Sequence, residues 1–230
     1  ETIAPPRNTG DVLQEGTDID VIAVAPDGVT MFAYDNVNGD LYKSTNAGVS
    51  FTTTAIGGTT LEAETDVVAI AVSPTYATDS TVVIATPDTV YRSSNGGVSF
   101  GAVSTALLLT ATGADGADTF ITSVDVATYY TGGALAIVIG TKDTTADQGG
   151  GVWICRLDTW TWDDQEVGDV AGGDGDDAAA ADVYAVAFSP NHLSDAQILA
   201  VVTGTTGAGD YAADTTHLAT KFAASAWASD

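Results

Sequence analysis

Two segments of this chain repeat almost the same eleven residues. LYKSTNAGVSF spans residues 41–51 and VYRSSNGGVSF spans residues 90–100, so equivalent positions lie 49 residues apart. Self-similarity at a period of about 20–50 residues is typical of chains that stack one supersecondary unit on the next, because a single unit cannot bury its own apolar face. We therefore expect a chain built from successive, similar units.

Both segments contain the spacing Ser-x-Asn-x-Gly-x-x-Phe. Hydroxyl and amide side chains can hydrogen-bond nearby backbone groups, and glycine tolerates a positive φ. The aromatic residue can then fold back against the strand. The spacing predicts a structural turn in each segment, formed by Ser44, Asn46, Gly48 and Phe51 in the first and by Ser93, Asn95, Gly97 and Phe100 in the second.

Four short apolar runs begin the units. They lie at 20–26, 67–74, 121–127 and 183–190, with starts 47, 54 and 62 residues apart. A second apolar run follows each of them after a turn, at 29–34, 81–86, 134–140 and 197–204. Their length and their content of β-branched residues are typical of buried strands rather than helices.

The turn pattern resembles the Asp-box, or BNR, repeat of sialidase-like and sortilin-like β-propellers, with Asn where the commonest form has Asp. The pattern Ser-Pro-x4-Asp, at 73–79 and again at 189–195, is similar to the same superfamily. The resemblance implies an all-β chain, a β-propeller of about 50-residue, four-stranded blades. It covers the first two units fully, whereas the third keeps only a remnant at 149–162.

We expect four blades, preceded by residues 1–19 as an N-terminal leader or closing strand. They are predicted at about 20–56, 67–105, 121–168 and 183–230. The fourth is expected to keep two strands and then lose the pattern. Asp-box propellers usually have six or more blades, so the resemblance implies a larger ring. The alternative is a ring of four, completed by residues 1–19.

The charge excludes several functions. With 31 acidic and 6 basic side chains the formal charge is −25, which leaves nothing to neutralise a row of phosphates, so we expect no nucleic-acid partner. No apolar run approaches the roughly 18 residues of a membrane span. The N-terminus lacks a signal-peptide pattern, although a mature exported protein would look the same.

Aspartate dominates this charge, which favours turns between strands over helices. A solvated surface is one interpretation, and calcium-dependent assembly or life in high salt are the others. The segment 163–182 is the most acidic. Within it Asp174, Asp176 and Asp177 form the candidate calcium site, with a solvated linker as the alternative. We expect no cofactor other than this Ca²⁺.

The residues do not assemble an obvious active site. Sialidases, as the resemblance implies, clamp a carboxylate with three arginines, but Arg7, Arg92 and Arg156 do not converge from several first strands. A xyloglucanase needs only two carboxylates in one cleft. Asp125 lies in the first strand of unit three, where we expect it to face solvent at a blade edge. The alternative places it near the axis as an acid–base group.

Histidine and cysteine offer little chemistry. His192 and His217 are expected in loops, and neither has metal-ligand spacing to its neighbours. Cys155 is the only cysteine, which excludes an internal disulfide. It lies in the apolar run VWIC, where we expect a buried thiol rather than a nucleophile.

The sequence thus favours a non-catalytic, secreted or cell-surface structural module of a surface layer, sheath or filament. It would act by self-association bridged by cations, with copies of itself, other surface proteins or glycans as partners. Two alternatives stay open: a glycan-active enzyme of the sialidase or xyloglucanase type, and an intracellular or periplasmic scaffold that holds a partner.

Overall fold

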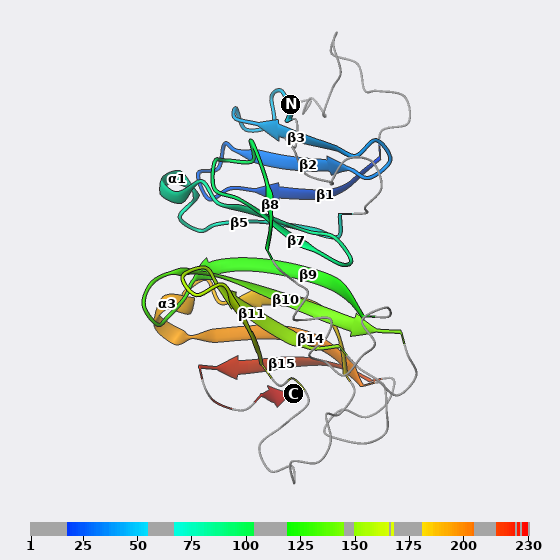
Figure 1. The fold of residues 1–230 in the computed structure, drawn as a ribbon, viewed down its shortest axis with the longest axis vertical. Coiled ribbons are helices and arrows are strands. Elements are labelled where there is room, and N and C mark those ends of the chain that lie inside the picture. The colour runs from blue at the N-terminus through cyan, green and yellow to red at the C-terminus, as the bar shows by residue number, and fades with distance from the viewer. Residues whose placement is uncertain are drawn as a thin grey trace. The chain divides into compact units, whose positions relative to one another are not determined.

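The computed structural model describes residues 18–54, 67–103, 119–144, 150–165, 167, 181–204, 215–223, 225 and 227–229. They form four antiparallel sheets of four strands each, which we call blades 1 to 4 in chain order (Figure 1). The predicted all-β fold of four-stranded blades is confirmed. The chain divides into two compact units, with blades 1 and 2 in residues 1–103 and blades 3 and 4 in residues 104–230.

In the first unit, each strand pairs with the next along the chain. Blade 1 consists of β1 (Ile19–Val24), β2 (Met31–Asp35), β3 (Asp40–Ser44) and β4 (Thr52–Thr54). Blade 2 consists of β5 (Ala69–Val72), α1 (Tyr76–Asp79), β6 (Val82–Ala85), β7 (Val90–Ser93) and β8 (Gly101–Val103).

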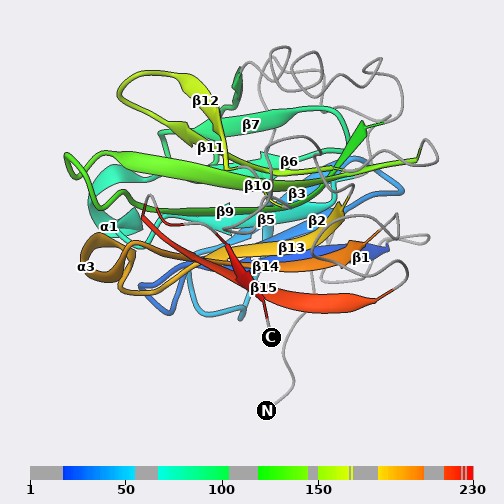
Figure 2. The same cartoon turned by 90° about the horizontal axis from the view of Figure 1, so that it is seen from below.

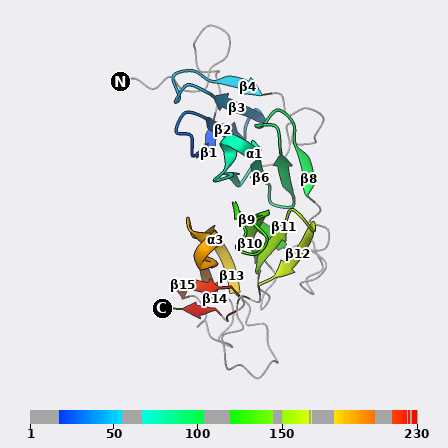
Figure 3. The same cartoon turned by 90° about the vertical axis from the view of Figure 1, so that its left-hand side faces the viewer.

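The second unit repeats this order with longer strands, and Figure 3 shows β9 to β12 side by side. Blade 3 consists of β9 (Thr119–Thr128), β10 (Leu135–Asp143), β11 (Val152–Arg156) and β12 (Thr161–Asp164). Blade 4 consists of β13 (Ala181–Phe188), α3 (His192–Asp195), β14 (Gln197–Gly204), β15 (Thr216–Phe222) and β16 (Ala228–Ser229). Figure 2 shows α3 at one end of β13 and β14.

Blade 4 corrects two expectations. Its pattern does not end after two strands, because β15 pairs with β14 along its whole length and β16 pairs with β15. His217 therefore lies on a strand, not in a loop. The sequence did not predict β15, because threonine and alanine separate the larger apolar residues of this strand and leave no continuous apolar run.

Register divides every blade into two faces. The forward face of blade 1 comprises Val21, Ala23, Phe32, Tyr34, Leu41 and Lys43. The rear face of blade 2 comprises Ile70, Val72, Val82, Ile84, Tyr91 and Ser93. Apolar side chains of these two faces belong to one buried cluster. Blade 1 thus buries its forward face against the rear face of blade 2, which is the burial that stabilises the unit.

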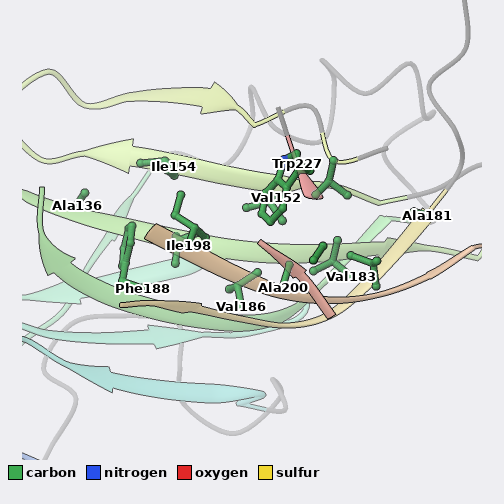
Figure 4. Packing of buried hydrophobic residues seen from close by; sticks show 14 of the residues in the cluster. Ala136, Val152, Ile154, Ala181, Val183, Val186, Phe188, Ile198, Ala200 and Trp227 are labelled. Carbon is green, nitrogen blue, oxygen red and sulfur yellow. The ribbon is translucent and has the colours of Figure 1, made fainter. Parts of the chain in front are cut away.

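Blades 3 and 4 pack in the same way (Figure 4). The forward face of blade 3 supplies Ala127, Ala136, Val138, Val152 and Ile154. The rear face of blade 4 supplies Val183, Val186, Phe188, Ile198, Ala200, Val202 and Ala219. We call this packed interface the 3–4 seam.

Four faces take no part in these two seams, among them the rear face of blade 1 and the forward face of blade 4. The rear face of blade 1 comprises Ile22, Val24, Met31, Ala33, Asp35, Asp40, Tyr42 and Ser44. The forward face of blade 4 comprises Asp182, Ala185, Ala187, Gln197, Leu199, Val201, Thr203, Thr216, Leu218, Thr220 and Phe222.

The Ser-x-Asn-x-Gly-x-x-Phe turns follow β3 and β7. In the first, Ser44 Oγ accepts the Gly48 N–H at 2.9 Å and donates to Asn46 Oδ1 at 2.9 Å. The second repeats this with Ser93, Gly97 and Asn95 at 2.9 and 2.8 Å. Both glycines have positive φ, 81° and 86°. Phe100 is buried and Phe51 is half-buried.

The Ser-Pro-x4-Asp turns hold α1 and α3. Ser189 Oγ donates to Asp195 Oδ2 at 2.6 Å, and the Gln197 N–H donates to Asp195 Oδ1 at 3.0 Å. These two bonds hold the pKa of Asp195 below its ordinary value, because they favour the ionised carboxylate. Ser73 and Asp79 form the same bond at 2.6 Å in blade 2. Each aspartate therefore joins the start of the turn to the strand that follows it.

The contact between blades 1 and 2 predicts a graded cost for alanine at three glycines. Gly97→Ala should destabilise by about 2–4 kcal/mol, because the φ is positive and the new Cβ would lie 2.8 Å from the Phe32 ring. Gly28→Ala, at φ +71° in open space, should cost about 1 kcal/mol. Urea unfolding measures the difference.

Gly101→Ala is the control, since it has ordinary φ and no neighbour within 4 Å. Equal losses at Gly28 and Gly97 would contradict the contact with Phe32.

Candidate functional site

The 3–4 seam gathers several of the polar residues that the sequence draws attention to. Thr122 on β9 ties the two blades together, since its Oγ1 donates to the carbonyl oxygens of Gly140 and Val183 at 3.0 and 2.6 Å. Gly140 has no room for a side chain, because a Cβ there would lie 2.7 Å from a Val183 methyl group. The seam is therefore a close backbone approach with polar groups at both of its ends.

Asp125 lies in this seam, and the expectation that it faces solvent is wrong. Its Oδ2 accepts the N–H of Phe188 in blade 4 at 2.8 Å, and its Oδ1 accepts the N–H of Val126 at 2.8 Å. Register explains the position: Asp125 pairs with Val138, whose side chain is on the forward face. Burial raises the pKa of Asp125, and the Phe188 N–H opposes that rise.

His192 adds an aromatic cluster at the same end of the seam. Its ring lies 4.5 Å from Phe188 and 5.6 Å from both Tyr129 and Tyr130, centroid to centroid. The side chain is buried, and its Nδ1 lies 3.0 Å from the Gln197 carbonyl oxygen. His192 therefore packs as a core residue of α3. The sequence gives no sign of this, because the contacts come from two blades.

Arg156 borders this cluster. Its guanidinium lies 5.3 Å from the centroid of Tyr129, and its Nη2 bonds Asp158 at 2.6 Å. Burial, followed by a hydrogen bond with Tyr130, raises the pKa of Tyr129 to about 12. Arg156 and Arg92 lie on the third strands of their blades, β11 and β7. The Arg156 guanidinium thus contacts residues of its own blade, Asp158 and Tyr129.

At the opposite end of the seam the Asp182 carboxylate bonds the backbone of Asp143, where the sequence did not predict a site. Asp143 ends β10 and Asp182 lies at the start of β13; both are buried. Asp182 Oδ1 accepts the Asp143 N–H at 2.9 Å, and Thr119 Oγ1 donates to Asp143 Oδ2 at 2.9 Å. Burial raises the pKa of Asp182, although the Asp143 N–H opposes it. We call Asp143 and Asp182 the acid pair.

The remaining candidates divide into two groups. Cys155 is buried as predicted, and burial raises the pKa of its thiol to about 11, which favours the protonated thiol at neutral pH. The proposed calcium ligands Asp174, Asp176 and Asp177 lie outside the described residues. Among the described residues no group of three or more His, Cys, Asp or Glu side chains is arranged to hold a metal ion. No described helix is long and apolar enough to cross a membrane.

Solved structures share this arrangement of blades. A GH74 enzyme from Niastella koreensis superposes with a TM-score of 0.56 at 17% identity, over 90% of this chain and 28% of its own. The Dos1 propeller gives 0.59 at 9% identity, over 99% and 51%, and YCF48 bound to D1 peptide gives 0.53 at 11%, over 93% and 55%. The fold is that of a β-propeller.

This chain spans little more than a quarter to just over half of those three structures. At such identities the likeness concerns the fold alone. No protein-family model and no curated protein matches the sequence.

The seam predicts a stabilising role for Asp125. Asp125→Ala should lower the free energy of unfolding by about 1–3 kcal/mol, because it leaves the Phe188 N–H without its acceptor. Asp125→Asn should cost less, since its amide oxygen can still accept one hydrogen bond. Denaturant unfolding monitored by tryptophan fluorescence gives both values.

Asp158→Ala is the matched control. It removes an exposed carboxylate paired with Arg156 and should change stability by less than about 1 kcal/mol. If Asp125→Ala behaved like this control, Asp125 would not hold the two blades together.

Proposed function

We propose that this chain is a non-catalytic propeller module of the Asp-box kind, secreted or exposed at a cell surface, that builds a surface layer, sheath or filament by self-association. The observation that carries the proposal is the forward face of blade 4. Its apolar residues include Leu199, Val201, Leu218 and Phe222, and of these Leu218 and Phe222 are 46% and 49% exposed. Exposed apolar faces of this kind mark interaction sites.

The described carboxylates support a structural reading. Asp125 holds two blades together, Asp79 and Asp195 close the turns at α1 and α3, and Asp27 accepts the N–H groups of Val29 and Thr30 at 2.9 and 2.8 Å. Short carboxylates that accept backbone N–H groups are common turn formers. Such aspartates shape the fold and need no substrate to explain them.

Net charge sets the conditions of assembly. At −25 per 230 residues, copies repel one another at the low ionic strength where screening is weak. Close packing needs cations to neutralise that charge. The acidic segment 163–182, with Asp174, Asp176 and Asp177, is where we place bound Ca²⁺.

Assembly should therefore depend on cations. Light scattering should show growth of the particle in millimolar Ca²⁺ or in high salt, and EDTA should reverse the calcium-driven part. Replacing Asp174, Asp176 and Asp177 together with Asn should abolish the response to Ca²⁺ and leave the response to salt. A particle that stays monomeric across chelator, Ca²⁺ and molar salt would refute self-association.

A glycan-active enzyme is the second candidate, favoured by the acid pair. A glycosidase needs one carboxylic acid with a raised pKa beside a second carboxylate, and burial raises the pKa of Asp182 next to Asp143. Solved structures with this fold include a GH74 xyloglucanase from Xanthomonas campestris. Against catalysis, both side chains are buried, which closes them to a polysaccharide.

Incubation with xyloglucan, followed by measurement of reducing ends, should show no hydrolysis. Cleavage that is lost in Asp182→Asn but kept in Asp158→Asn would replace the structural proposal with the enzymatic one. Asp158 is a suitable control because it is an exposed carboxylate at the other end of blade 3.

A further inference from the structure

We propose that the forward face of blade 4 binds the rear face of blade 1 of a second copy, head to tail. This inference rests on the proposed self-association and names the two surfaces that make it. Both surfaces repeat, position by position, the halves of the seams already inside the chain.

Register establishes this equivalence. Val72 in blade 2 and Phe188 in blade 4 both directly precede the dipeptide Ser-Pro. Val72 pairs with the first residue of β6, and Phe188 pairs with the second residue of β14. Counting back two residues, Ile70 corresponds to Val186. The matching positions in blade 1 are Ile22 and Val24. In blade 1 they pair with Ala33 and Met31 on the second strand. In blade 2, Ile70 and Val72 pair in the same way with Ile84 and Val82.

The rear face of blade 1 is exposed at positions where the rear faces of blades 2 and 4 are buried. Ile22 is 72% exposed, whereas Ile70 and Val186 are 9% and 8% exposed at the equivalent position. Val24 is 55% exposed, whereas Phe188 is 5% exposed. Farther from β1 on the same face, Ala33 and Tyr42 are buried. The free part of this face is therefore the apolar side of β1.

The forward face of blade 4 is likewise exposed at a position that is buried in blade 1. Leu218 corresponds to Leu41 of blade 1, because Leu218 pairs with Val201 as Leu41 pairs with Tyr34. Leu41 and Tyr34 are fully buried under blade 2, while Leu218 is 46% exposed. Among the described residues the register places one charged side chain on this face, that of Asp182, which pairs with Thr203 and is buried. The exposed part of the face, with Leu218 and Phe222, therefore adds little to the repulsion between copies of so acidic a chain.

A second copy carries the surface that is complementary to each of these two. Each of the two seams described above joins a forward face to a rear face, and the forward face of blade 4 and the β1 side of the rear face of blade 1 are both exposed. Forward-to-rear contact between copies would set Leu218 and Val201 against Ile22 and Val24, the same aliphatic chemistry as the internal seams. Such a contact is heterologous, and heterologous contacts repeat from copy to copy until they close into a ring or continue as a filament.

Single charges on the two faces test the proposal. In a buffer where the unchanged chain assembles, Leu218→Asp and Ile22→Asp should each abolish assembly in sedimentation velocity, because each places a carboxylate on one half of the contact. Both positions are exposed within one chain, so melting temperature and circular dichroism should change little. Val49→Asp is the matched control: its side chain is 65% exposed in the turn after β3, and it should assemble as before.

Mixing the two variants identifies the pairing. The Leu218→Asp copy keeps an intact rear face and the Ile22→Asp copy keeps an intact forward face, so an equimolar mixture should form dimers and nothing larger. An isologous contact between two blade 4 faces would respond to Leu218→Asp alone. That result, or a mixture that stays monomeric, overturns the head-to-tail contact.

The outcomes also separate this inference from the proposed function. A chain that never assembles refutes both. A chain that assembles regardless of Leu218→Asp and Ile22→Asp retains self-association and refutes the surfaces named here.

Discussion

The packing of one blade's forward face on the next blade's rear face is the interaction on which the rest of the structure depends. A four-stranded sheet with apolar residues on both sides is not stable in water by itself, because either face left open costs hydrophobic free energy. Stacking removes one face of each blade from water. In blade 1 this packing removes the side chains of Phe32, Tyr34 and Leu41 from water, and all three are fully buried.

Polar groups then fix how the stacked sheets meet. Thr122 and Asp125 reach from blade 3 to backbone groups of blade 4, so that burying one apolar face also satisfies backbone atoms of the next blade. In the first unit Lys43 does the same, donating to the Gly96 carbonyl oxygen at 2.7 Å while its Nζ lies 5.7 Å from the Phe32 ring centroid. Short aspartate and threonine side chains suit this task, since they hold the blades close.

The sequence predicts what is local and misses what is assembled across blades. Ser44, Gly48 and their partners in the second turn lie within a few residues of one another, so their hydrogen bonds can be anticipated from spacing alone. The acid pair is separated by 39 residues and meets only because β10 and β13 are neighbours in the seam. Asp125 was misplaced for the same reason. Its acceptor role depends on Phe188, 63 residues away, and nothing in its own strand indicates that partner.

Charge and apolar surface act on different length scales. Repulsion between copies at −25 reaches about a Debye length, roughly 8–10 Å at physiological salt, and opposes approach from any direction. Contact between aliphatic side chains acts only once water has been displaced from between them. On the forward face of blade 4 the one charged side chain among the described residues, that of Asp182, is buried. Under the proposed self-association, salt would decide whether copies meet, and the exposed Leu218 and Phe222 would decide where.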